Sequence, residues 1–185
     1  GQYERAIEHY TRAIDIAREG DKKRNEGVNL GNLGDVLVKT ERFDEAEVAY
    51  RSAIVLGDET LPAAAGAFRG SLALLLSHKG HLDEAQVLVG DGEPQVETEP
   101  DEHAKFLCKK GHVCHMAGDT DGARMALKQA QDVLNVTRYM KELEDVMGSL
   151  NMLQQAEAQL QAASGVLNQD SSPQETRVAG EDALM

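Results

Sequence analysis

The stretch ERFDEAEVAYRSAI, residues 41–54, decides the fold, because variants of it occur elsewhere in the chain. It spaces large and small apolar residues, Phe43, Ala46, Tyr50 and Ala53, at intervals of three or four. A small residue at every second turn lets another helix approach closely, and the large residues fill the remaining space. The stretch therefore predicts a helix that packs tightly against a neighbouring helix.

Three further copies are GQYERAIEHYTRAI (residues 1–14), GHLDEAQVLV (80–89) and GDTDGARMALKQA (118–130). Ala6, Ala46, Ala85 and Ala123 occupy the same place in the four copies. A period of about 40 residues indicates stacked supersecondary units that bury their apolar faces against each other. The third copy degrades after Val89, so we expect its hairpin to be short or distorted and 90–102 to form a surface loop.

A second helical pattern precedes each of the last three copies. It is clearest at 28–37 and recurs at 63–79 and at about 101–117. Pro100 lies where a helix would begin, since its missing N–H has no helical partner there. Gly80 and Gly118 lie where a helix would end and the chain would turn. The chain therefore predicts pairs of helices joined by short turns.

The combination of NLG at 32–34 with Phe43, Ala46, Tyr50 and Ala53 resembles a tetratricopeptide (TPR) repeat. That family's repeat is a helix–turn–helix of about 34 residues. The longer spacing here resembles the long-repeat branch found in the LGN group, kinesin light chains and many bacterial TPR proteins. The resemblance implies an all-α, right-handed α-solenoid of TPR hairpins with a C-terminal capping helix.

The domain prediction follows from these patterns. Residues 1–134 are predicted to hold the repeats, and an apolar spacing of three and four after 134 predicts a capping helix or helices. The predicted segments are 1–20 (second helix of repeat 1), 25–57 (repeat 2), 62–92 (repeat 3), 101–134 (repeat 4), 136–163 (cap) and 164–185 (disordered tail).

Composition narrows the function. The net charge of −13 argues against binding to nucleic acids or to anionic membranes, which requires clustered Lys and Arg. No apolar run approaches the roughly 20 residues of a membrane span, and the chain opens inside a repeat without a signal peptide. We therefore expect a cytoplasmic fragment of a longer protein. Cys108 and Cys114, six residues apart on one predicted helix, point to different faces and are not expected to form a disulfide.

The resemblance implies that the first helix of each hairpin lines a concave groove that holds a partner's peptide or helix. The candidate partner-binding residues are Asn29, Asn32, Asp35, Lys39, Ser71, Lys105, Lys109 and His112. Lys105 and Lys109 lie one turn apart and can reach the same anion, which favours an acidic partner. Ala67, Gly70 and Ser71 are small and share one helical face, so we expect empty volume there for a peptide backbone. The pattern of polar residues does not match the carboxylate clamp of co-chaperone TPR domains.

The sequence gives little support for metal binding or catalysis. Cys108, His112 and His115 share a helical face and form a weak candidate zinc site, but no fourth ligand is evident and two lysines lie close by. Nothing indicates an orienting acid or an oxyanion hole, so we expect no enzyme and no cofactor. The alternatives to a peptide-binding scaffold are a regulatory or spacer arm that contacts its own chain, a metal- or ligand-sensing array, and self-association through exposed repeat ends.

Overall fold

The computed structural model describes residues 1–133, and within them the chain consists of seven α-helices joined by short turns. The helices are α1 (Gln2–Glu19), α2 (Lys23–Lys39), α3 (Phe43–Thr60), α4 (Pro62–His78), α5 (Leu82–Val96), α6 (Pro100–Met116) and α7 (Thr120–Val133). The predicted pairing of helices is confirmed for this part of the chain. The predicted capping helix and tail lie outside the described residues.

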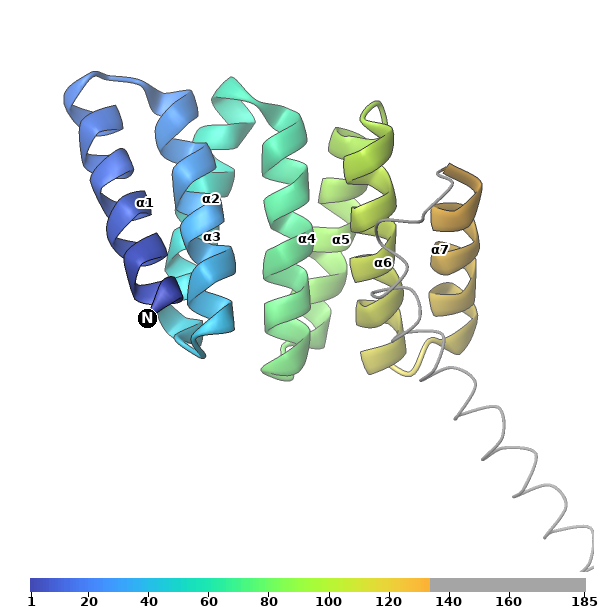
Figure 1. Cartoon of the computed structure of the whole chain (residues 1–185). Helices are drawn as coiled ribbons and strands as arrows, with labels where there is room; N and C mark the ends of the chain where they lie inside the picture. The colour runs from blue at the N-terminus through green and yellow to red at the C-terminus, as the bar shows by residue number, and fades with distance from the viewer. Residues whose placement is uncertain (134–185) are drawn as a thin grey trace, which may run out of the picture. The chain divides into compact units, whose positions relative to one another are not determined.

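Each helix packs against the next one along the chain, and α4 also packs against α6 and α2. The first helices of the hairpins, α2, α4 and α6, stand side by side toward the viewer in Figure 1, and α3 and α5 lie behind them. We call α2, α4 and α6 the first-helix row, and α1, α3, α5 and α7 the second-helix row. This order puts residues about 39 positions apart at matching places in each row.

The repeated alanines are the centre of the hairpin packing. Ala46, Ala85 and Ala123 are completely buried, and Tyr50 is only 2% exposed. A side chain larger than alanine would hold the two helices of a hairpin apart. The positions of these alanines in the sequence therefore determine where the two helices of each hairpin make their closest contact.

Glycines bring the first-helix row together. The ring of Phe68 on α4 lies directly over Gly31 on α2, where a Cβ atom would overlap it. One repeat later, a Cβ on Gly70 would lie 2.8 Å from the ring of Phe106 on α6. The expectation of empty volume at Gly70 was therefore wrong, because the neighbouring first helix fills that space with an aromatic ring.

The predicted loop at 90–102 was also wrong, because α5 continues through Gly90, Gly92 and Pro94 to Val96. Gly92 is buried at the close approach of three helices, and a Cβ there would lie 2.8 Å from the Phe106 ring. Val96 is completely buried and anchors the end of the helix, while Pro94 is exposed. Gly92 therefore serves packing and does not break the helix, and only residues 97–99 connect α5 to α6.

The turns before α5 and α7 use glycine as predicted. Gly80 has φ +84° and Gly118 has φ +78°, a left-handed conformation that other residues adopt at a cost. The corresponding turn before α3 has Glu41 at φ 60°. All three turns have a residue with positive φ at the same position, and this residue is glycine in two turns and Glu41 in the third.

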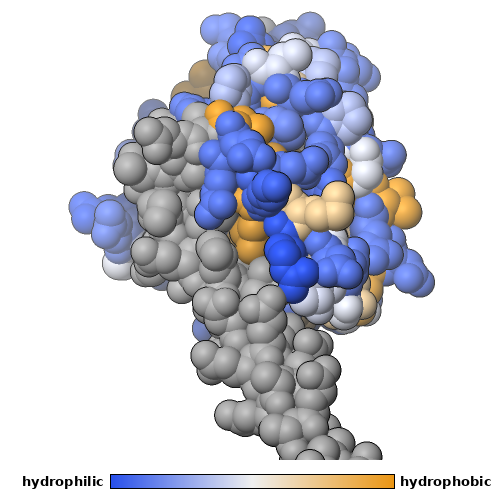
Figure 2. Space-filling view, turned by 90° about the vertical axis from the view of Figure 1, so that its right-hand side faces the viewer, coloured by the Kyte–Doolittle hydropathy of each residue, from blue (hydrophilic) through white to orange (hydrophobic). Residues whose placement is uncertain are grey.

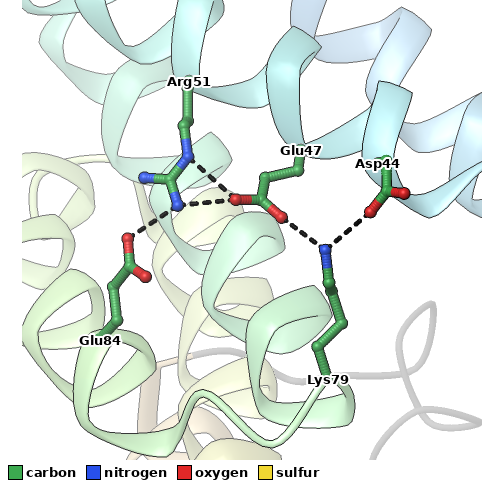
Figure 3. A network of polar contacts seen from close by, with 5 residues as sticks. All are labelled: Asp44, Glu47, Arg51, Lys79 and Glu84. Carbon is green, nitrogen blue, oxygen red and sulfur yellow. Dashed lines mark hydrogen bonds and ion pairs between the residues drawn. The ribbon is translucent and has the colours of Figure 1, made fainter.

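Ion pairs connect the hairpins at their surface (Figure 3). The Lys79 ammonium at the end of α4 lies 2.9 Å from Asp44 and 2.8 Å from Glu47 on α3. Arg51 joins Glu47 to Glu84 of α5. The hydrogen bond from Lys79, followed by that from Arg51, holds the pKa of Glu47 below its usual value. The network thus joins α3 to both helices of the next hairpin.

The surface is mainly hydrophilic where Figure 2 shows coloured residues, and its apolar areas are small and separated by polar ones. None of the helices in residues 1–133 is both long enough and apolar enough to span a bilayer. Most of the exposed large apolar residues, among them Val48 and Val87, lie on the second-helix row, and Met116 lies at the end of α6; some exposed apolar residues are usual for a folded protein.

Candidate functional site

A pocket of about 530 Å³ opens over the first-helix row. It is lined by Asp35, Val38 and Lys39 of α2, Phe43 and Tyr50 of α3, Ser71, Leu74, Leu75 and His78 of α4 with the adjoining Lys79, and Lys105 and Lys109 of α6. Its volume is in the range of sites that hold a small ligand or an anchoring side chain. Three successive hairpins therefore contribute to one pocket.

The pocket combines an apolar surface with four ammonium groups. Val38, Phe43, Leu74 and Leu75 supply the apolar part, and Phe43 is 42% exposed. Lys39, Lys79, Lys105 and Lys109 supply the cations, and Asp35 is the one carboxylate among the lining residues within 1–133. A ligand that carries both an apolar group and negative charge would complement this surface.

Two hydrogen bonds hold the polar side of the pocket. The Tyr50 hydroxyl donates to Asp35 Oδ1 over 2.7 Å, which joins α3 to α2. Lys109 Nζ donates to Ser71 Oγ over 2.8 Å, which joins α6 to α4. Burial, and then the charge of Asp35, raise the pKa of Tyr50 far above its usual value, so the hydroxyl stays protonated and remains a donor.

Ion pairs hold two more of the pocket's cations. Lys105 Nζ lies 2.6 Å from Glu102 Oε1, one turn earlier on α6. Lys79 is held by the α3 carboxylates of Figure 3. Both ammonium groups are more than a quarter exposed and can exchange these surface partners for a ligand anion at a small free-energy cost.

The structure brings five of the eight candidate residues together in this pocket: Asp35, Lys39, Ser71, Lys105 and Lys109. The other three, Asn29, Asn32 and His112, do not line it. Asn29 donates its amide to the backbone oxygen of Asn25 within its own helix. His112 lies behind His78, which does line the pocket; their ring centroids are 4.9 Å apart.

Sequence reasoning missed the contribution of α3 and of the residue that follows α4. Phe43 and Tyr50 were read only as repeat-defining residues, yet both line the pocket from the second-helix row. Lys79 follows the last residue of α4, and from the sequence it was only the end of the predicted helix at 63–79. The i, i+7 spacing of the two aromatics was the available signal, because it places both rings on one face of α3.

The three residues considered for zinc do not assemble into a site. Within residues 1–133, no group of three or more His, Cys, Asp or Glu side chains is placed to hold a metal ion. Cys108 is buried and Cys114 is half-buried, and neither forms a disulfide within the part of the chain that the structure describes. Burial, followed by the neighbouring His78 and then His115, lowers the pKa of His112. His112 therefore packs against His78 of α4, whereas Cys108 and Cys114 belong to the apolar cluster between α6 and α7.

Comparison with known protein families agrees with the repeat fold described above. Residues 1–54 match the family model described as tetratricopeptide repeat. Residues 1–54 carry the tetratricopeptide-repeat pattern. The predicted resemblance to the TPR family is confirmed, as is the all-α solenoid fold that it implied.

The solved structures that match include BtubC (BKLC) from P. vanneervenii, with a TM-score of 0.61 and 19% sequence identity. The match covers 72% of this chain and 57% of the BtubC chain, so this chain spans little more than half of that structure. At this level of identity the likeness shows a shared fold and nothing about partners. None of the curated proteins matches the sequence.

Proposed function

We propose that this TPR chain binds an acidic segment of a partner protein, with one apolar side chain of that segment seated in the pocket over α2, α4 and α6. TPR repeats are in general protein–protein interaction modules, and nothing in the described residues supports a catalytic role. The single observation that carries the proposal is the cluster of four lysines around an apolar surface. It lies in a chain whose net charge is −13.

The distribution of charge supports an acidic ligand. Lys39, Lys105 and Lys109 come from two helices of the first-helix row and face the same pocket. Carboxylates of a ligand placed between them would gain charge-assisted hydrogen bonds and would be steered toward the pocket at low salt. The same lysines would repel a basic peptide.

The apolar part of the pocket supports an aliphatic or aromatic anchor. Leu74 and Val38 are only partly buried, and Phe43 exposes much of its ring. Covering this surface with a leucine side chain would contribute about 2 kcal/mol of binding free energy. The favoured motif is therefore a leucine or similar residue with acidic residues on both sides.

The test is fluorescence anisotropy with a labelled peptide in which one Leu is flanked on each side by two Glu residues. We expect saturable binding that weakens at least tenfold when Lys105→Glu and Lys109→Glu are combined. The matched control combines Lys110→Glu with Lys128→Glu, which changes the net charge equally. Lys110 pairs with Glu93 of α5, and Lys128 lies on α7, so neither lines the pocket.

Two comparison peptides complete the experiment. Replacing the Leu by Ser should weaken binding through the apolar surface, and replacing the Glu residues by Lys should abolish it. Equal losses in the pocket variant and in the control variant would show that only net charge matters and would contradict the proposal. Binding that neither double variant weakens would show that the peptide binds outside the pocket.

A further inference from the structure

Four side chains form a continuous line of hydrogen bonds across the pocket. Lys109 of α6 donates to Ser71 of α4 over 2.8 Å, and Tyr50 of α3 donates to Asp35 of α2 over 2.7 Å. Burial and Asp35 raise the pKa of the Tyr50 hydroxyl, and a hydrogen bond with Ser71 acts in the opposite direction. The line therefore joins α6 to α2, the two outer members of the first-helix row in Figure 1, through α4 and α3.

The direction of donation is the same in each of these bonds. An ammonium group only donates and an ionised carboxylate only accepts, so Lys109 and Asp35 fix the two ends of the line. A hydrogen bond lowers the pKa of a hydroxyl when the oxygen of that hydroxyl accepts it, so Ser71 donates to Tyr50. The other acceptor near Ser71 is the backbone oxygen of Ala67 at 3.4 Å, which is long for a hydroxyl donor. All donors of the line therefore point from α6 toward α2.

The line has an ammonium group at its α6 end and a carboxylate at its α2 end. At the α6 end Lys105, one turn from Lys109, adds a second ammonium group to the pocket. At the α2 end Asp35 and Lys39, also one turn apart, carry opposite charges, and no other lining residue within 1–133 is a carboxylate. Lys79, the fourth ammonium group, is held by two carboxylates of α3. The attraction for a ligand carboxylate is therefore strongest beside α6.

Asp35 is a supported hydrogen-bond acceptor at an exposed position. A carboxylate has about four acceptor sites, and Tyr50 occupies one of those on Asp35. Tyr50 is only 2% exposed and gives the carboxylate a rigid support, while Asp35 itself is exposed. A ligand amide can donate a charge-assisted hydrogen bond to Asp35. A ligand carboxylate in the same place would be repelled by Asp35 while Lys39 attracts it, so it would gain little.

We infer that the pocket distinguishes the two sides of its ligand's apolar anchor: acidic residues bind beside Lys105 and Lys109, and an uncharged donor, the side-chain amide of Gln or Asn, binds Asp35. This inference rests on the proposed function, because it assumes the same acidic segment with its anchor over Leu74. It narrows the motif with acidic residues on both sides, since carboxylates are required on the α6 side only. Asp35 is the residue that determines this specificity.

Peptides with acidic residues on one side of the leucine test the inference. The symmetric peptide is Glu-Glu-Leu-Glu-Glu, and the one-sided peptide, Gln-Gln-Leu-Glu-Glu, is also made in the reverse order, because a segment can run either way across the row. All have blocked ends and the same fluorophore. In fluorescence anisotropy, the tighter one-sided peptide should bind at least as tightly as the symmetric peptide, despite its two fewer charges. Gln-Gln-Leu-Gln-Gln should bind roughly tenfold more weakly, because no carboxylate faces α6.

Asp35→Asn is the decisive variant, because the Asn side-chain oxygen still accepts the hydrogen bond from Tyr50 while the charge is lost. It should invert the order of the peptides, since Lys39 then attracts carboxylates on the α2 side unopposed. We expect the symmetric peptide to bind this variant roughly threefold more tightly than the one-sided peptide. The matched control is Asp15→Asn, which changes the net charge equally at an exposed residue of α1 that does not line the pocket. The control should keep the parent's order.

Each other outcome has a definite meaning. Tighter binding of the symmetric peptide to the parent chain would overturn the inference and leave the proposed function standing, because peptide charge alone would then set the affinity. An unchanged order of peptides in Asp35→Asn would also overturn it, since the preference would not depend on that carboxylate. Inversion in Asp15→Asn as well would assign the preference to net charge, against the inference. If no peptide binds, the proposed function fails and the inference fails with it.

Discussion

The two rows of helices differ sharply in charge. The second-helix row, α1, α3, α5 and α7, carries fifteen acidic and six basic residues. The first-helix row, α2, α4 and α6, carries four acidic and seven basic residues. Among the seven helices of residues 1–133, the excess of negative charge thus lies on the second-helix row, and the first-helix row is basic. Net charge alone would have assigned the wrong sign to the candidate site.

The rows also differ in how they use small residues. The second-helix row buries alanines against the first helices, as Ala46 and Ala85 do. The first-helix row brings its own members together with glycines under aromatic rings, Gly31 under Phe68 and Gly70 under Phe106. The contact between neighbouring first helices is therefore the less tolerant of added volume.

The strongest test of this difference is Gly31→Leu. A side chain there would displace the Phe68 ring, so we expect a loss of about 3 kcal/mol in the free energy of unfolding. Gly90→Ala on α5 is the counterpart, because nothing lies within 4 Å of its Cβ position. That change should stabilise the chain by up to about 1 kcal/mol, since alanine favours a helix. Urea unfolding of both variants measures the contrast, and equal effects would refute it.

A smaller effect is expected inside the hairpin. Ala46→Leu should overpack the contact between α2 and α3 and lower the free energy of unfolding by about 2 kcal/mol. Val48→Leu, two residues later, changes a side chain that is 65% exposed and should stay within about 0.5 kcal/mol of the parent. Thermal melts followed by circular dichroism separate the two. An unchanged melting temperature for Ala46→Leu would mean that the helix pairing is wrong.

The smallest effect concerns acid pH and the first-helix row. The folded pKa of His112 is lowered, chiefly by burial and also by His78 and His115, while an unfolded histidine titrates near pH 6.5. As the pH falls through about 6.5, the unfolded state takes up a proton before the folded state does. Stability should therefore decrease from about pH 6.5 downward until the folded pKa is reached.

Melting temperatures at pH 7.5, 6.5 and 5.5 test this sign. His112→Gln should lose less stability on acidification than the parent chain. His81→Gln, at an exposed histidine in the turn before α5, serves as the control and should keep the parent's dependence on pH. If all three proteins respond alike, His112 does not contribute to the pH dependence.

Sequence reasoning succeeded where one residue type has one physical use. Alanines at a fixed period predicted the hairpin contacts, and Gly80 and Gly118 predicted turns because the left-handed conformation favours glycine. It failed at Gly70 and Gly92, because a glycine can leave open space, end a helix or permit close packing within one. The choice between these uses depends on which side chain lies opposite, and Phe106 comes from a different hairpin.

The candidate site shows the same limit. Lys105 and Lys109 could be placed on one face from their spacing alone, and both line the pocket. The contribution of Lys79 to the pocket could not be predicted from spacing, because it depends on how the end of α4 packs against α3. The bond between Lys109 and Ser71 joins residues 38 positions apart, a pairing that exists only once the hairpins stack.

The sequence by itself determined the repeat, its period of about 40 residues and the helical hairpin, because local spacing of small and large residues specifies which face of a helix is buried. The tertiary structure alone decided which first-helix residues meet and how a basic pocket forms in an acidic chain. These features depend on distances between side chains of different hairpins, and no local pattern encodes those distances.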